Sequence, residues 1–367
     1  MKKRNDRMKN PRTKQKTAFI AALCLAAVLI AGIWAAGVIV YEKVCNVRYT
    51  TYEPTMLRLE DFDGLQRTRW QFASDKGQML TGYWYSHSAG EPQRGIVVIA
   101  HGFGGGGHTY YMDCADWFAR HGYYVFAYDA TGNDESEGKG VGGLPQGVID
   151  LGYAISFVEE SGSFPALPIV LFGHSWGGYS VCAVLADHPE VKAVIECAGF
   201  NRTSDMIEAA GQEYIGKLAA VMTPFIKLHE RIRFGAYASR TGLEGLAASQ
   251  AAVLVAHSAD DDTVPMECGY DVFWEAYHDD PRVQFLRLEG RGHNLFTDTA
   301  YNDVFNAGWR AYRETLDYDY QDKKNADRFA ADKAEYIRKN LDRARYSHRL
   351  NQDLFERFLA FYDGHLS

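Results

Sequence analysis

The strongest contrast between polar and apolar positions lies at the start of the chain. Residues 1–16 contain eight Lys or Arg and one Asp, and residues 17–41 form an uncharged apolar stretch. A helix crosses the hydrocarbon core of a bilayer with about 20 residues, whereas the apolar part of a secretory signal has about 7 to 15. The pattern therefore favours a basic cytoplasmic tail at 1–16 and a retained transmembrane anchor at 17–41.

A long cleavable signal is the alternative for this segment, with cleavage near the small residues Ala35 and Ala36. Under either interpretation we expect the rest of the chain to be exported, because the basic flank should stay in the cytoplasm. Residues 42–64 are interpreted as a juxtamembrane linker. We therefore expect a single-pass protein of a plasma membrane, of bacterial type, with a cytoplasmic N-terminus and an extracytoplasmic body.

From residue 65 onward, short strand-like runs recur between helical patterns. The later runs are continuously apolar, which is typical of parallel strands with helices on both faces. The first two have no helix between them and predict an antiparallel hairpin. The sequence thus predicts an α/β domain over 65–367 with an eight-stranded, mostly parallel sheet. The predicted strands are Arg67–Ala73, Met79–Ser86, Gly95–Ala100, Tyr123–Tyr128, Ile169–Gly173, Ala193–Cys197, Ala252–Ala256 and Val283–Leu288.

Two segments depart from this alternation. Residues of about 200–250 carry apolar positions at helical spacing and predict a small helical cap insertion, which could seal the sheet edge or form a lid over a site. Residues of about 316–367 form a C-terminal helical extension. Its charged part, 322–345, predicts a solvated helix, and its end predicts a docked helix with the apolar positions Leu350, Leu354, Phe355, Phe358, Phe361 and Tyr362.

Charge and cysteine content narrow the classes of function. The chain of 367 residues has a net charge of −8, and removal of the tail, at eight minus one or +7, leaves about −15 on the body. This charge argues against nucleic acid as a partner. The six cysteines form no C-x-x-C pair, and Cys182 and Cys197 lie in apolar runs as core residues. No feature of the sequence sets an oligomeric state.

The strongest local motif is Gly173-His174-Ser175-Trp176-Gly177, which matches G-x-S-x-G between an apolar strand and a helix. A nucleophile on such a sharp turn has strained backbone angles, and side chains two residues away would crowd it. Ser175 is therefore the candidate nucleophile, and the helix that follows directs its N-terminal amides at a developing oxyanion.

With this motif, residues from about Leu65 to Leu295 resemble the α/β-hydrolase superfamily, and most closely its lysophospholipase-like and serine-aminopeptidase-like branch. A second element of that family is a strand ending in His-Gly, matched here by His101-Gly102. The resemblance implies an α/β-hydrolase fold and a serine hydrolase, with the backbone amides of Phe103 and Trp176 as its oxyanion hole.

The resemblance also places the acid after the next-to-last core strand, where Asp260, Asp261 and Asp262 are adjacent. The family's D-x-x-V-P pattern selects Asp261; Asp262 could cap a helix and Asp260 could be solvated. His293 follows the last strand. The order Ser175, Asp261, His293 is the one that this fold uses, with His293 as general base and Asp261 as the group that orients it.

A rival interpretation is a dinucleotide site, because Gly102, Gly104 and Gly107 satisfy G-x-G-x-x-G and Asp129 follows the next strand. It is weaker, since two strands precede the supposed first one. Asp129, Gly132, Ser136 and Gly138 also fit a D-x-x-G-x-x-x-S-x-G turn of the family, although Thr131 and Asp134 replace its usual arginine and glycine. His101, His108 and His174 are interpreted as turn or wall residues.

The leading functional hypothesis is hydrolysis of a carboxylic ester, such as a monoacyl lipid or a short acyl ester, without metal or organic cofactor. The expected partners are a small acyl substrate and the membrane that holds the N-terminal helix. An exported serine peptidase or aminopeptidase and an acyltransferase use the same chemistry and stay open. A catalytically inactive binding module is a further alternative, and it predicts damage to the triad that the sequence does not show.

Overall fold

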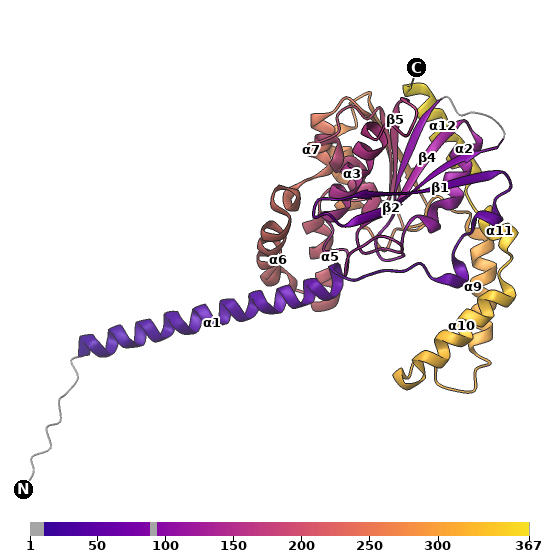
Figure 1. The fold of residues 1–367 in the computed structure, drawn as a ribbon. Helices are drawn as coiled ribbons and strands as arrows, with labels where there is room; N and C mark the ends of the chain where they lie inside the picture. The colour runs from indigo at the N-terminus through magenta and orange to yellow at the C-terminus, as the bar shows by residue number, and fades with distance from the viewer. Residues whose placement is uncertain (1–10, 89–93, 367) are drawn as a thin grey trace, which may run out of the picture.

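The computed structural model describes residues 11–88 and 94–366, so residues 1–10 of the predicted basic tail lie outside the described residues. The first element is a single helix, α1 (Pro11–Cys45), which projects from the body (Figure 1). It is longer than the predicted apolar segment at both ends. Within the described chain it is the one helix long and apolar enough to cross a membrane.

The body is built on one eight-stranded sheet with the order β1-β2-β4-β3-β5-β6-β7-β8. β1 and β2 form the expected antiparallel hairpin, β2 is also antiparallel to β4, and all other neighbours are parallel. The predicted eight-stranded, mostly parallel sheet is thus confirmed. Its strands are β1 (Leu65–Ala73), β2 (Met79–His87), β3 (Gly95–Ala100), β4 (Tyr123–Asp129), β5 (Ile169–His174), β6 (Ala193–Cys197), β7 (Ala252–Ser258) and β8 (Val283–Leu288).

The continuous apolar runs arise because the central strands are covered on both faces. In β3, Ile96 and Val98 face one core cluster while Val97 and Ile99 face the other. Burial of every position favours Val, Ile, Leu and Phe over an alternating pattern. The first face packs against α3 (Gln146–Glu160), α4 (Trp176–Ala183), α7 (Gly242–Ala248) and α8 (Tyr270–Tyr277), and the second against α2 (Met112–Arg120) and α12 (Gln352–His365).

Between β6 and β7 the chain forms a helical hairpin of α5 (Thr203–Ile215) and α6 (Leu218–Phe234). This hairpin lies within the segment interpreted as a cap. It packs against the end of α1, where Tyr41, Cys45 and Ile226 form a small separate apolar cluster. The N-terminal helix is therefore joined to the body through the insertion between β6 and β7.

The C-terminal extension begins earlier than predicted. It consists of α9 (Thr299–Arg313), α10 (Ala326–Asn340), α11 (Arg343–Ser347) and α12. α9 and α10 form a projecting hairpin (Figure 1) held by aromatic contacts such as Trp309 with Tyr336. α12 buries the predicted apolar stripe on the body, and its Tyr362 hydroxyl donates to the Leu171 carbonyl of β5 at 2.7 Å.

The segment after α1 is packed on the body rather than extended as a free linker. The Tyr49 amide donates to the Gly132 carbonyl, and the Asp134 amide donates to the Tyr49 carbonyl, both at 3.0 Å. The Asp134 carboxylate accepts hydrogen bonds from Thr51 and from the Gly107 amide. Asp134 has a φ of +33°, which explains a glycine at this turn in the family, and its side chain here anchors the segment.

Short 3₁₀ turns complete the chain at Glu53–Thr55, Leu59–Asp61, His108–Tyr111, Val184–Ala186, Gly235–Ser239, Met266–Cys268 and Lys323–Asn325.

Candidate active site

Ser175 stands on a sharp turn between β5 and α4. Its backbone angles are φ 57° and ψ −117°, in a region that a residue with a side chain rarely adopts. The turn is held because the Ser175 amide donates to the Cys197 carbonyl of β6 at 2.8 Å. The strained serine therefore sits at the carboxyl end of the central strands.

The glycines of the motif are required by close backbone contacts. A Cβ at Gly173 would lie 2.2 Å from the Gly177 carbonyl oxygen, and one at Gly177 would lie 2.0 Å from the Ala100 carbonyl oxygen. Neither neighbour is a flexible side chain that could move aside. The spacing of G-x-S-x-G thus reflects the packing of the turn against β3 and α4.

Asp261 and His293 are hydrogen-bonded. His293 Nδ1 lies 2.8 Å from Asp261 Oδ2, while Asp261 Oδ1 accepts from the amides of Thr263 and Val264, each at 2.9 Å. Burial raises the pKa of Asp261, but hydrogen bonds from His257, His293 and Val264 outweigh it and hold the pKa well below its usual value. Asp261 is therefore ionised beside the imidazole.

The two carboxylates adjacent in sequence to Asp261 have different surroundings. Asp260 Oδ1 accepts from Ser258 Oγ at 2.5 Å and from the amides of Arg291 and Gly292, so it braces the loop that carries His293 and is not merely solvated. Asp262 is exposed and accepts from Thr263 Oγ1 at 3.3 Å, and the 3₁₀ turn starting at Met266 has no side-chain cap.

Ser175 and His293 line the same cavity, which has a volume of about 310 Å³. Phe103 also lines it, so the loop after β3, the turn after β5 and the loop after β8 meet there. A larger groove of about 620 Å³ lies along α3 and contains none of these residues, so we place the candidate site in the smaller cavity. The full lining is Gly102, Phe103, Gly105, Gly106, Tyr110, Tyr111, His174, Ser175, His293, Asn294, Phe296, Thr297, Asn302 and Arg349.

The predicted oxyanion-hole residues adjoin each other. The Phe103 and Trp176 rings pack edge to face with centroids 5.5 Å apart, and Trp176 Nε1 donates to the Leu144 carbonyl at 2.7 Å. His101 shapes the same loop, because its Nε2 accepts from the Ala130 amide and its Nδ1 donates to the Gly102 carbonyl. Contacts with Trp176 at the start of α4 and with Ala130 after β4 thus hold the loop after β3.

A hydrogen-bond chain joins this loop to the His293 loop. The Gly102 amide donates to Tyr111 Oη at 2.9 Å, Tyr111 Oη lies 2.9 Å from His174 Nδ1, and His174 Nε2 lies 3.0 Å from the His293 carbonyl. Since a carbonyl only accepts, His174 donates through Nε2 and accepts from Tyr111 through Nδ1. Burial lowers the pKa of His174 to about 3, so it stays neutral and keeps this direction.

A second buried acid and histidine lie behind Asp261. His257 Nε2 is 2.9 Å from the Val264 carbonyl and 3.3 Å from Asp261 Oδ2. Burial raises the pKa of nearby Glu196 to about 7, although the charge of His257 lowers it. Neither residue was predicted from the sequence, although a carboxylate inside the apolar run Ala193–Cys197 is an anomaly that could have indicated them.

Two other residues of the candidate site, Tyr111 and Arg349, were not predicted from the sequence. Tyr111 is part of the hydrogen-bond chain between the two loops. Arg349 precedes α12 and lines the cavity, with its Nε 3.2 Å from Oδ2 of the buried Asp113 on α2. Burial lowers the pKa of Arg349, but the charge and hydrogen bond of Asp113, together with the nearby Tyr346, outweigh it and raise the pKa. A cation is therefore present at the wall of the cavity, and no local motif indicated it.

The structure contradicts the dinucleotide interpretation. Asp129 is fully buried, and its Oδ1 lies 2.7 Å from His108 Nδ1 and accepts from the His108 amide at 2.9 Å. A Cβ at Gly107 would lie 1.8 Å from the same oxygen. Asp129 thus cannot reach a ribose, and Gly107 is required by packing against its carboxylate.

Among the described residues, one group could hold a metal ion: Glu159, His188 and Glu190 on the surface. None of the three lines the cavity that contains Ser175.

Comparison with known proteins places this geometry in a recognised fold. Residues 91–241 match the family described as serine aminopeptidase, S33. No curated protein sequence matches the chain. Two crystal forms of an esterase from Pyrococcus furiosus are similar in structure, one with 16% identity, a TM-score of 0.51 and coverage of 74% of this chain and 96% of that one. The other has 15% identity, a TM-score of 0.50 and coverage of 81% and 99%.

An α/β hydrolase from Penicillium sp. sh18 has 20% identity and a TM-score of 0.49, with coverage of 68% of this chain and 97% of that one. At 15–16% identity, the likeness to the two Pyrococcus furiosus crystal forms shows the fold alone. The chain therefore has the α/β-hydrolase fold that its motifs implied.

Proposed function

We propose that this chain is a membrane-anchored serine hydrolase that cleaves carboxylic esters, with Ser175 as nucleophile, His293 as general base and Asp261 as the orienting acid. One observation carries the proposal. The strained Ser175 and His293 line one cavity, and His293 is hydrogen-bonded through Nδ1 to a buried, ionised Asp261.

The first half-reaction follows from these groups. The bond from Nδ1–H to Asp261 leaves His293 Nε2 to accept the Ser175 proton, and the serine oxygen attacks the ester carbonyl. The amides of Phe103 and Trp176 would bind the oxyanion of the tetrahedral intermediate. Such donors are effective because they are fixed before reaction, and the loss of one typically costs about 100- to 1000-fold in rate.

Loss of the alcohol completes the first half-reaction, and hydrolysis of the acyl group on Ser175 by water is the second. His293 gives its proton to the departing alcohol, which leaves an acyl group on Ser175. Water then loses a proton to His293 and attacks the acyl carbonyl, and the serine recovers its proton as the acid is released. The neutral His174 fixes the His293 backbone through both steps.

The lining of the cavity favours an ester over a peptide with a free amino terminus. An α-ammonium group in a partly dry cavity needs a carboxylate partner. The described lining contains no Asp or Glu, and its permanent charge is the cation Arg349. The match to a serine aminopeptidase family keeps peptide hydrolysis as the second candidate. Acyl transfer to an alcohol needs the same acyl-enzyme and differs only in the acceptor.

We also propose that α1 anchors the enzyme. Tyr41 Oη donates to Glu230 Oε1 at 2.8 Å, and Tyr41 is buried in the body. The helix is continuous through Ala35 and Ala36, and the side chains of Met222 and Ile226 lie beside Gly37. These contacts favour a retained helix over a cleaved signal. The basic flank would hold the N-terminus in the cytoplasm and the body outside.

A hydrolysis panel tests this function. The full-length protein and Ser175→Ala are compared on short and medium acyl esters and on matched aminoacyl amides. We expect ester hydrolysis by the native protein, loss of at least 1000-fold in kcat for Ser175→Ala, and little amide hydrolysis. Hydrolysis of amides in preference to esters would favour the peptidase, and no turnover by the folded native protein would favour a binding module.

A further inference from the structure

Helix α6 carries an apolar stripe that neither the body nor α1 covers. Leu218 and Ile232 are each 66% exposed, Val221 is 50% and Leu228 is 51%, while Phe225 is partly buried. At about 100° per residue, these five positions fall within an arc of about 80°. Outside α1, half of the large apolar side chains exposed in the described chain lie on this helix. Such a concentration is typical of an interaction surface.

The opposite side of α6 is fixed against the protein. Its buried positions are Ala219, Thr223, Ile226, Glu230 and Phe234. Glu230 accepts from Tyr41, and His229 Nε2 lies 3.1 Å from Glu42 Oε1, to which Arg233 also pairs. The orientation of the stripe is therefore set by contacts with α1, and the stripe points away from the body.

The contacts with α1 lie where its apolar segment ends. They run from Gly37, beside Met222 and Ile226, to Glu42, which is paired with Arg233. Residues 17–41 measure about 37 Å as a helix, against about 30 Å for the hydrocarbon core. The last residues before Glu42 therefore reach the headgroup region, and α6 lies at the same level.

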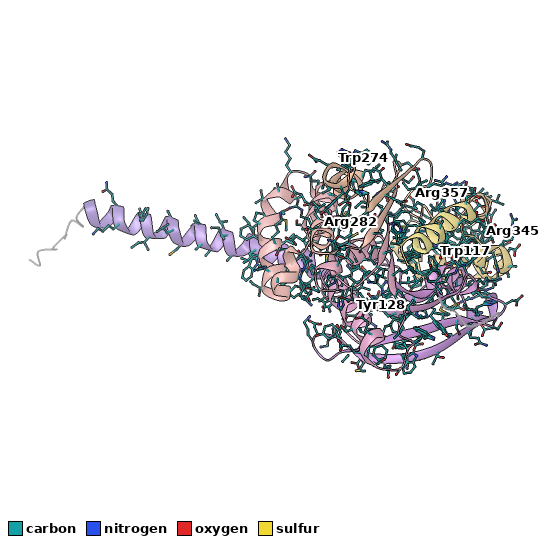
Figure 2. All side chains as sticks on the ribbon, turned by 90° about the horizontal axis from the view of Figure 1, so that it is seen from above. Trp117, Tyr128, Trp274, Arg282, Arg345 and Arg357 are labelled. Carbon is teal, nitrogen blue, oxygen red and sulfur yellow. The ribbon has the colours of Figure 1, made fainter. Side chains whose placement is uncertain are left out.

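The apolar stripe of α6 faces the side of the body from which α1 projects. In both views α1 leaves the body at the end where α6 lies, and α6 runs across the direction of α1 (Figure 1, Figure 2). A helix that crosses a transmembrane anchor at the membrane surface lies along that surface. Its side remote from the body then faces the lipid.

We propose that α6 is an interfacial helix that embeds Leu218, Val221, Phe225, Leu228 and Ile232 in the bilayer that holds α1. This inference rests on the proposed anchor. Amphipathic helices of this kind lie in the headgroup region with basic residues on their polar side. Arg231 is exposed nearest the edge of the stripe and is placed to meet anionic headgroups, whereas Lys227 is exposed farther round on the polar side. The catalytic body is thereby fixed on the membrane at two points.

Attachment to the membrane at two points favours one class of substrate. A body that is fixed at two points cannot rotate freely about its anchor, so the same face of the enzyme always meets the lipid surface. Esters that partition into the headgroup region are then presented to a constant side of the protein. Amphiphilic esters carried by the membrane are the substrates that this arrangement suits.

Fluorescence of the full-length protein in vesicles tests the inference. In a Cys24→Ala background, whose other cysteines are buried, an environment-sensitive label is attached at Leu228→Cys on the stripe or at Lys227→Cys as the control on the polar side. The vesicles contain phosphatidylcholine and phosphatidylglycerol, with or without lipids that carry a quencher. Iodide serves as the aqueous quencher. Flotation of the vesicles measures the anchor independently.

We expect the label at 228 to be quenched by the lipid-borne group and to be several-fold less accessible to iodide than the label at 227. If the protein floats with the vesicles but iodide quenches the labels at 227 and 228 equally, the interfacial helix is overturned and the anchor is not. Protection from iodide at 228 without lipid quenching would also overturn it, because a second copy of the chain then covers the stripe. Failure to float would overturn the anchor as well, while ester hydrolysis would still be measurable.

Discussion

The ring of Tyr49 packs edge to face against the ring of Phe103, with centroids 5.1 Å apart. Tyr49 follows the N-terminal helix, and Phe103 is the proposed oxyanion residue after β3. The Tyr49 backbone is itself paired with Gly132 and Asp134 of the body. The segment between α1 and the body therefore packs against the loop that carries the proposed oxyanion hole.

This contact predicts a kinetic defect in Tyr49→Ala. Removal of the ring frees the Phe103 loop, and a small displacement of a fixed donor weakens oxyanion binding more than substrate binding. We expect kcat on a soluble ester to fall by about 10- to 100-fold with KM little changed. Tyr52→Ala is the matched control, because Tyr52 is exposed in the same segment. Equal activity of the two variants would contradict the coupling.

Tyr111→Phe tests the hydrogen-bond chain between the two loops. The change removes the acceptor of the Gly102 amide and the donor to His174, and a buried unpaired polar group costs about 1–3 kcal/mol. We expect a lower Tm and a loss of at least tenfold in kcat. Tyr110→Phe, which also lines the cavity, should change neither by a comparable amount. If Tyr111→Phe has the same kcat as the native protein, the hydrogen-bond chain is not needed for catalysis.

Glu196 predicts a dependence of stability on pH. Burial raises its pKa from 4.5 to about 7, so between these values the folded protein holds a proton that the unfolded chain releases. This contribution to the free energy of unfolding is fully present below about pH 4.5 and is lost as the pH rises through about 7. Thermal unfolding of the native protein and of Glu196→Gln, from about pH 5 to about pH 8, measures it. We expect the native Tm to decline more steeply, and parallel curves would contradict the assignment.

The Asp113 and Arg349 pair ties the C-terminal extension to α2. The side chains are 1% and 12% exposed, so Arg349→Met leaves a buried carboxylate without its cation, a change that typically costs about 3–5 kcal/mol. The double variant with Asp113→Asn should recover most of that loss in denaturant unfolding. If the double variant is as unstable as Arg349→Met, the pair is not the source of the effect.

The sheet and the turn that carries Ser175 were predictable because they are encoded locally. Continuous apolar runs mark buried strands, and the glycines at 173 and 177 are dictated by backbone contacts within one turn and its neighbouring strand. The conspicuous polar sequence around Asp261 and the glycine-flanked His293 could be found from the chain order of the fold. These features needed no knowledge of how distant segments meet.

The other site residues depend on contacts that no local pattern contains. Arg349 returns to the cavity after a hairpin of two helices, and Tyr111 is recognisable only through its bonds to Gly102 and His174. Likewise, an apolar stretch at 17–41 predicts an anchor but not its contact with Glu230. The sequence shows that α6 is amphipathic, whereas the direction of its stripe follows from the packing on α1.

The most direct test of the account is the intact mass of the full-length protein after reaction with a fluorophosphonate, followed by peptide mapping. The account predicts one phosphonyl group per chain on Ser175 in the native protein and none in Ser175→Ala. It also predicts much slower labelling in His293→Ala, because the serine then lacks its base. A phosphonyl group on any other residue, or no labelling of the folded native protein, would contradict the account.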